Sequence, residues 1–135
     1  MEPKDVVNVL DNMVNAVRPG GVVLDLQVIR PDPRVELNEQ LVCEIDGEAL
    51  FRKADAATDA IEALIRTGRL VEEASDDHDV RKHYDDGDDL IDDFQDKARQ
   101  LPLEALPRLQ AIARPLVVRE RCRLRRLGVQ SARDG

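Results

Sequence analysis

Hydrophobic and polar positions recur with different periods along the chain, and the first of these patterns predicts a helix over residues 3–17. Its apolar positions fall on one helical face: Val6, Leu10, Met13, Val14 and Val17. Pro19 cannot continue this helix, and Gly20 and Gly21 can adopt the left-handed backbone angles that a helix end requires. The run at residues 21–29 is almost entirely apolar and largely β-branched, which is typical of a strand covered on both faces.

A hairpin is predicted next. The two prolines within residues 30–33 favour a loop, because proline disrupts strand pairing. Asp46-Gly47 is typical of a two-residue hairpin turn, and it lies between short extended stretches at residues 41–45 and 48–51. Such a hairpin is a candidate either to cap a substrate pocket or to take part in dimerisation.

The second helix is predicted to begin at Asp55, a good N-terminal cap, and to end at Thr67. Gly68 suits the left-handed position that terminates a helix. Residues 69–74 then turn back as an extended segment.

The acidic stretch at residues 76–93 invites comparison with metal sites. A calcium-binding loop needs carboxylates at alternate positions and a glycine at the sixth, whereas Gly87 comes too early in this stretch. His78 and His83 are spaced for neither one face of a helix nor one face of a strand. We therefore assign no metal ligands.

The C-terminal third is predicted to contain two helices and a strand. Asp86 or Asp88 caps the first helix, and a short second helix lies within residues 103–113. Residues 116–127 alternate with period two, which predicts a strand with one wet face. That face carries arginines: Arg119, Arg121, Arg123 and Arg125. Residues 128–135 are predicted to be a disordered tail.

Composition narrows the functional classes. The length of 135 residues suits one domain, which we place over residues 1–127. A net charge of −8 and a total of one tyrosine, two phenylalanines and no tryptophan argue against a nucleic-acid partner. The charge is uneven, with acids dense over residues 72–96 and arginines concentrated over residues 114–126. The two cysteines, Cys43 and Cys122, favour free core thiols over a disulfide.

Neither a signal peptide nor an apolar run of membrane-spanning length is found in the sequence. A cytoplasmic location without a membrane partner is therefore expected. The preference for arginine over lysine, with abundant aspartate and alanine, is typical of a high-GC bacterial genome.

The Arg18-Pro19-Gly20-Gly21 turn, with a helix before it and an apolar strand after it, resembles the turn before the fifth strand of class I S-adenosylmethionine-dependent methyltransferases. The later order, including Gly68 and the His83-Tyr84-Asp85 stretch before an acidic helix, is similar to the C-terminal half of that family. The resemblance implies an α/β fold with a partial Rossmann-like sheet of about three to five strands, mixed parallel and antiparallel and flanked by helices. It also implies that residues 116–127 form an antiparallel strand between the fifth and sixth strands.

The same resemblance implies where a cofactor and a substrate would bind. The family builds its cofactor site in its N-terminal half, from a Gly-rich loop and an acidic residue, and this sequence contains no Gly-x-Gly. We therefore assign no catalytic or cofactor-binding residue, and we expect S-adenosylmethionine only if the missing half is supplied. Substrate-side groups lie at the carboxyl ends of such strands, which makes Asp25, Gln27 and Arg30 the candidates; alternatively, Asp25 and Gln27 face a helix end or solvent.

Two functional hypotheses remain. The first is a methyltransferase-like protein or fragment that is not catalytically competent alone. The second is a non-catalytic dimeric interaction or regulatory module that keeps the half-fold. In the second case the strand at residues 21–29 would have a bare edge, which predicts a homodimer or a partner chain along that edge. The arginine-rich strand face is a further candidate, to dock on the acidic segment of a partner subunit or to stay solvated.

Overall fold

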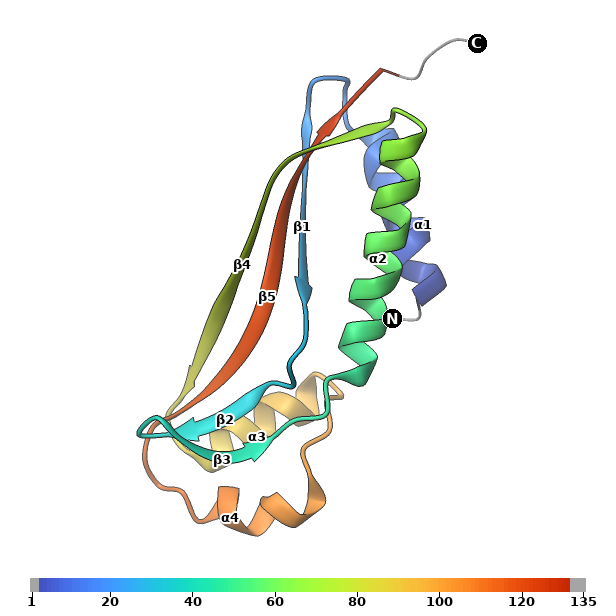
Figure 1. Cartoon of the computed structure of the whole chain (residues 1–135). Helices are drawn as coiled ribbons and strands as arrows, with labels where there is room; N and C mark the ends of the chain where they lie inside the picture. Colours follow the sequence, from blue (N-terminus) through green and yellow to red (C-terminus); the bar gives the residue numbers. More distant parts are fainter. Residues whose placement is uncertain (1–2, 132–135) are drawn as a thin grey trace. The chain divides into compact units, whose positions relative to one another are not determined.

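The computed structural model describes residues 3–131, without the side chains of residues 3–8 and 11. Helices and strands follow one another along the chain (Figure 1). In order they are α1 (Pro3–Ala16), β1 (Val22–Val28), β2 (Arg34–Leu37), β3 (Gln40–Glu44), α2 (Glu48–Arg66), β4 (Leu70–Tyr84), α3 (Gly87–Asp96), a single 3-10 turn (Leu103–Ala105), α4 (Leu106–Gln110) and β5 (Leu116–Val129).

The chain forms two compact units, each with its own core. Unit 1 consists of the described residues up to 29, residues 49–78 and the described residues from 122 onward. It contains α1, β1, nearly all of α2 and the adjoining parts of β4 and β5. Unit 2 contains β2, β3, α3, α4 and the remaining parts of β4 and β5, from residues 30–48 and 79–121. No change in composition marks this division in the sequence.

Antiparallel pairing connects all five strands, and β5 is the central one. The hydrogen-bonded order is β1-β5-β2-β3, with β4 also paired to β5. The pairs β1–β5, β2–β5 and β2–β3 are antiparallel, and the arrows of β4 and β5 point in opposite directions (Figure 1). The expected mixed, Rossmann-like sheet is therefore wrong. β1 and β4 run in the same direction, but β5 lies between them and runs the opposite way, so no parallel pair forms among the described residues.

The turn between α1 and β1 forms as the sequence predicts. Gly20 has a φ of +87°, the left-handed conformation that glycine adopts without steric cost. A side chain at Gly21 would place its Cβ 2.5 Å from Cγ1 of Val17 and 2.9 Å from the carbonyl oxygen of Arg18. The two glycines thus have different roles, one in backbone conformation and the other in close approach.

The core of unit 1 lies between its helices and one face of its strands. Its buried residues come from α1, β1, α2, β4 and β5: Leu10, Val14, Val23, Ala57, Ile61, Leu70, Leu127 and Val129. On the other face of β1, Leu24 and Leu26 remain 59% and 55% exposed. The prediction that this strand is covered on both faces is therefore wrong, because the described residues supply helices to one face only.

Unit 2 begins with a hairpin at a different place from the predicted one. β2 pairs with β3 around Asn38 and Glu39, which have positive φ angles of 51° and 66°. Asp46-Gly47 precedes α2 instead of forming a turn between strands, and Oδ1 of Asp46 accepts a hydrogen bond from the Glu48 amide at 3.0 Å. α2 therefore begins at Glu48 and not at Asp55.

The core of unit 2 is built from its hairpin, its two helices and the ends of β4 and β5. Its buried residues include Val35, Ile45, Tyr84, Leu90, Phe94, Leu109, Leu116 and Val118. Asp86 caps α3 as predicted, because its Oδ1 accepts a hydrogen bond from the Asp89 amide at 2.8 Å. α4 confirms the short predicted helix, with Pro107 in its first turn.

β4 and β5 are both longer than the strands that the sequence predicts at residues 69–74 and 116–127. β4 is one strand from Leu70 to Tyr84 and includes the first part of the acidic stretch. β5 extends through Gly128 and Val129, beyond the expected end at Leu127, while residues 132–135 of the expected tail lie outside the described residues.

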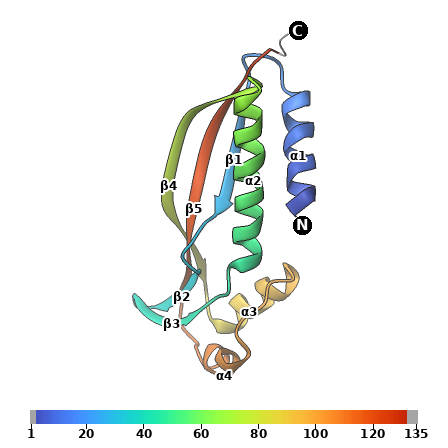
Figure 2. The ribbon, with the colours of Figure 1, turned by 45° about the vertical axis from the view of Figure 1, so that its right-hand side comes forward.

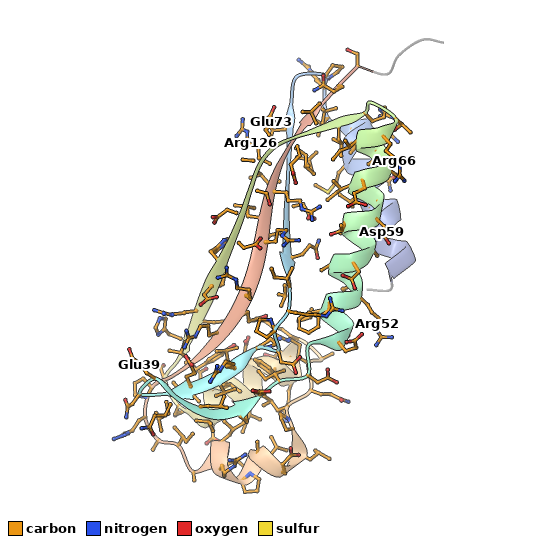
Figure 3. All side chains as sticks on the ribbon, viewed as in Figure 1. Glu39, Arg52, Asp59, Arg66, Glu73 and Arg126 are labelled. Atoms are coloured by element: carbon orange, nitrogen blue, oxygen red, sulfur yellow. The ribbon has the colours of Figure 1, made fainter. Side chains whose placement is uncertain are left out.

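Arginines of β5 pair with carboxylates of β4 in the same chain. In unit 1 the pairs are Arg126–Glu73 at 2.8 Å, Arg123–Asp77 at 2.8 Å and Arg125–Glu72 at 3.7 Å; in unit 2 the pair is Arg121–Asp79 at 3.2 Å. Figure 3 shows Glu73 and Arg126 close together on these two strands. The arginines that the sequence made candidates for docking on a partner thus contact acids of their own chain, and Arg125 is buried instead of wet.

Within residues 3–131, no helix is both long and apolar enough to cross a membrane.

Candidate functional site beside the free edge of β1

Among residues 3–131, β1 has an assigned hydrogen-bonding neighbour on one side only. It stands at the end of the strand order, paired with β5 from Val22↔Gly128 to Val28↔Cys122. A strand in this position presents unpaired backbone N–H and C=O groups along its other edge. Such an edge is a template for a further strand.

A groove of about 350 Å³ runs along β1 beneath α1. Eight residues line it: Val9, Leu10 and Met13 of α1, Leu24, Asp25, Leu26 and Gln27 of β1, and Lys53 of α2. Figure 2 shows α1 standing beside α2 on the helical side of β1. The groove therefore combines a free strand edge with an apolar helix surface.

The apolar side chains of the groove are unusually exposed for their type. Val9 and Met13 are each 41% exposed, and Leu24 and Leu26 are more exposed still. Single exposed apolar residues are common, whereas a cluster of them along one edge is typical of an interaction surface. The groove is the candidate site.

Asp25 gives the groove a buried charge. It is 8% exposed, and its Oδ1 accepts a hydrogen bond from Nε2 of Gln27 at 2.8 Å. In the register of the sheet, Asp25 lies opposite Arg125, which is also 8% exposed. Arg125 in turn donates from Nη2 to Oγ1 of Thr58 at 3.2 Å. The hydrogen bond from Gln27 partly compensates the burial of this carboxylate.

Two of the three predicted substrate-side residues meet in this groove. Buried Asp25 and half-buried Gln27 line it together. Arg30 belongs to unit 2 and is not among the lining residues. The sequence analysis did not identify Lys53, because no motif singles it out. It placed Met13 on the buried face of its helix, whereas Met13 is 41% exposed and lines the groove.

The lining residues do not fit S-adenosylmethionine. The resembling family holds its cofactor with a Gly-rich loop and an acidic residue; no glycine is among the eight lining residues, and Asp25 already accepts a hydrogen bond from Gln27. We therefore derive no chemical step that uses this cofactor. Within the described residues, no group of three or more His, Cys, Asp or Glu side chains could hold a metal ion.

A second hollow, of about 650 Å³, lies in unit 2. Its buried charge is Glu36, which receives hydrogen bonds from Nε and Nη2 of Arg119. These hydrogen bonds raise the pKa of the Arg119 guanidinium above its ordinary value. Because Glu36 and Arg119 satisfy each other, they join β2 to β5 and leave the hollow without an unmet buried charge.

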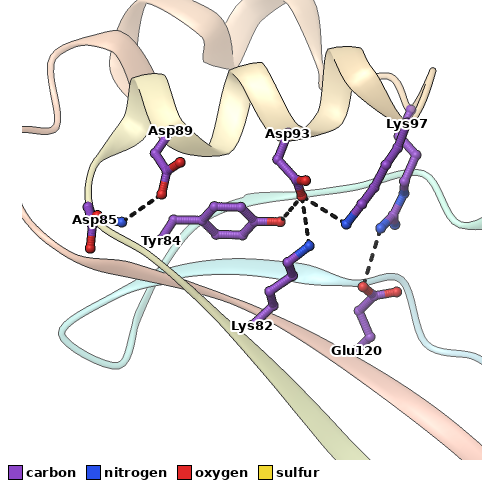
Figure 4. Close-up of polar contacts among 8 residues, drawn as sticks. Lys82, Tyr84, Asp85, Asp89, Asp93, Lys97 and Glu120 are labelled. Atoms are coloured by element: carbon purple, nitrogen blue, oxygen red, sulfur yellow. Dashed lines mark hydrogen bonds and ion pairs between the residues drawn. The ribbon is translucent and has the colours of Figure 1, made fainter.

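A third cluster closes α3 onto β4 (Figure 4). Oδ2 of Asp93 accepts hydrogen bonds from the Tyr84 hydroxyl at 2.5 Å, from Nζ of Lys82 at 2.9 Å and from Nζ of Lys97 at 2.9 Å. Burial, followed by the hydrogen bond to Asp93, raises the pKa of Tyr84 to about 12. Because Tyr84 and Lys82 belong to β4 while Asp93 and Lys97 belong to or adjoin α3, these contacts join the two elements.

Comparison with known proteins gives no relative: no family model, no curated protein and no solved structure matches this chain. The methyltransferase resemblance therefore remains a hypothesis from the residues quoted above.

Proposed function

We propose that this chain is a non-catalytic interaction module, whose sheet is extended at the free edge of β1 by a strand from a second polypeptide. The observation that carries the proposal is the groove in which an unpaired strand edge and exposed apolar side chains of α1 lie together. Strand addition satisfies the edge through backbone hydrogen bonds and lets alternate side chains enter the groove.

The energetics favour occupation of the groove. Four side chains lose their exposed apolar area when a strand covers them: Val9, Met13, Leu24 and Leu26. Each such burial contributes about 1 kcal/mol or more, and the new backbone hydrogen bonds add to it. These gains offset the entropy that association costs.

The position of α1 favours a different polypeptide over a second copy. Val9 and Met13 of α1 line the groove together with the edge residues of β1, so α1 overhangs the place of the next strand. Antiparallel pairing of two β1 strands across a two-fold axis would bring a second set of helices to the same side of the sheet. A strand that carries no helix on that side avoids this crowding.

Site-specific photo-crosslinking tests the proposal. A photoreactive residue replaces Leu26 in one variant and Leu103, which is 80% exposed and does not line the groove, in the control. In cells that produce this protein, we expect Leu26 to give one dominant adduct that maps to a single short segment of another polypeptide. Equal, scattered adducts at both positions would contradict the proposal.

A second candidate is a methyltransferase-related chain that is completed by another polypeptide. The observation that favours it is the place of β5, which pairs antiparallel with β1 and also pairs with β4, as the resemblance implies. In this case the added strand would belong to the polypeptide that carries the cofactor loop.

Calorimetric titration with S-adenosylhomocysteine separates the two candidates. We expect no heat of binding for this chain alone. Micromolar binding by the isolated chain would contradict the non-catalytic proposal. Binding that requires the crosslinked partner would favour the methyltransferase candidate.

A further inference from the structure

β5 shows which side chains suit a neighbour of β1. Across the antiparallel pair, Leu124 lies opposite Leu26, and Arg125 lies opposite Asp25. Leu26 points to the exposed face of the sheet, while Asp25 and Arg125 are buried on the helical side. On its paired edge, Asp25 therefore meets a cation on the helical side, while on the open face Leu26 meets Leu124 and Leu24 meets Arg126.

The free edge of β1 presents the same residues to an added strand. Leu24, Asp25 and Leu26 are consecutive and all line the groove. Side chains alternate between faces along a strand, so an added strand places one residue opposite Asp25 on the helical side. The two flanking residues then lie beside Leu24 and Leu26 on the open face.

Asp25 sets the chemistry of the residue opposite it. A further strand removes the remaining water from a carboxylate that is already 8% exposed. A buried carboxylate is costly unless charged or hydrogen-bonding groups compensate it, so an apolar residue at this position would be penalised. Lys53 also lines the groove, so binding should depend on direct contact with Asp25 more than on the net charge of the groove.

We infer that the strand bound at this edge carries an apolar–cationic pair of consecutive residues, the apolar one opposite Leu26 and arginine or lysine opposite Asp25. The inference rests on the proposed function and specifies the partner of the same groove. β5 itself is the template, because its Leu124-Arg125 step already pairs with Asp25 and Leu26 on the other edge.

A synthetic peptide provides the test. The probe has the sequence of residues 121–129 with Cys122→Ser, and the matched peptide carries Arg125→Glu in addition. A control peptide carries Arg121→Glu, which changes the charge equally outside the Leu124-Arg125 pair. We expect the probe to bind the intact chain and to slow amide hydrogen exchange over Val22–Val28. We expect Arg125→Glu to weaken binding at least about tenfold and Arg121→Glu to weaken it much less.

Changing the peptide leaves the fold of the protein untouched, so loss of binding cannot result from unfolding. The protein variant Asp25→Asn should abolish the preference for the probe over the Arg125→Glu peptide. Equal binding of these two peptides would overturn the requirement for a cation opposite Asp25 while leaving the proposed function intact. Slowed exchange over β4 and not β1 would place the peptide on the acidic strand and would also overturn the inference. Self-association that protects β1 without any peptide would identify a second copy as the occupant and overturn the heterologous strand.

Discussion

At the scale of single residues, Asp93 is the best-connected carboxylate outside the groove. One of its oxygens accepts hydrogen bonds from Tyr84, Lys82 and Lys97, and these bonds hold its pKa well below the ordinary 3.8. The same contacts raise the pKa of Lys82. The cluster links β4 and α3, so its protonation should affect the stability of unit 2.

Tyr84 is the only tyrosine of the chain, and its ionisation can therefore be followed by absorbance without interference. We expect a pKa of about 12 in the folded protein. Asp93→Asn should lower this pKa, because the charged acceptor that keeps the phenol protonated is lost. Asp92→Asn, on the exposed neighbour of Asp93, is the control and should leave the titration unchanged. An unaltered titration in Asp93→Asn would contradict this account.

Acid stability should depend on the same carboxylate. The folded-state pKa of Asp93 is lowered, so its contribution is fully present above about pH 4 and is lost as the pH falls toward the lowered value. In urea unfolding, Asp93→Asn should be less stable than wild type at neutral pH, and the difference should shrink on acidification. A difference that stays constant between neutral and strongly acidic pH would show that the charge of Asp93 has no such role.

At the scale of elements, local polar contacts fix the boundaries of α3. Oδ1 of Asp86 binds the Asp89 amide at 2.8 Å, and Oδ2 of Asp89 accepts from the Asp85 amide at 3.0 Å. This reciprocal pair satisfies two amides at the start of the helix.

Removing the cap should destabilise the protein modestly. We expect Asp86→Ala to reduce the free energy of unfolding by about 1 kcal/mol, because the Asp89 amide loses its acceptor. Asp86→Asn keeps an acceptor and should change stability by only a few tenths of a kcal/mol. Urea unfolding of the two variants checks the prediction, and equal losses would show that the hydrogen bond is unimportant.

The pairing of β4 with β5 depends on ion pairs between exposed side chains. Arg123 contacts Asp77 through two hydrogen bonds, at 2.8 Å and 3.0 Å, and each side chain is about one third exposed. A double-mutant cycle with Arg123→Ala and Asp77→Ala should give a coupling energy of about 0.5 kcal/mol, decreasing with added salt. A coupling energy near zero at low salt would show that these charges provide solubility and not strand pairing.

At the scale of the whole molecule, the binding edge should leave a distinct thermodynamic signature. If the natural occupant is a strand of another polypeptide, the melting temperature of the isolated chain should not depend on its own concentration. The peptide of residues 121–129 with Cys122→Ser should raise the melting temperature in proportion to its occupancy. Leu26→Lys should abolish that rise, whereas Leu103→Lys, outside the groove, should preserve it. A melting temperature that rises with protein concentration alone would instead indicate self-association.

Short-range physics allowed several elements to be predicted from the sequence. Helical periodicity identified α1, and Gly20 marked its end because few other residues adopt its φ of +87°. Period-two alternation identified β5, and an aspartate followed by acidic first-turn residues identified the start of α3. Each of these signals acts within a few residues, so no distant part of the chain could change it.

Where a local sequence pattern is compatible with two structures, residues distant in sequence decided which one forms. Asp46-Gly47 suits a hairpin turn or a helix start, and the second forms here, with the Gly47 amide bound to Oδ1 of Asp32 at 3.0 Å. The acidic residues of β4 favour solvent by themselves, and in the folded chain they lie across from arginines of β5 that are distant in sequence. Burial of Asp25 likewise depends on β5 and α2, which are far from it in sequence.

The sequence by itself thus determined the local elements of this protein, and it placed two of the three candidate residues, Asp25 and Gln27, on the strand that borders the groove. Only the tertiary structure decided that β5 pairs with β1, β2 and β4, and that the sheet is therefore antiparallel where the sequence predicted a mixed one. The tertiary structure alone also decided that one face of β1 is exposed and that one edge of β1 has no assigned strand neighbour among the described residues. The groove lies along this edge, between β1 and α1. The physical reason is that hydrophobic periodicity reports that a side chain can be buried, whereas its actual burial depends on which elements are present to cover it.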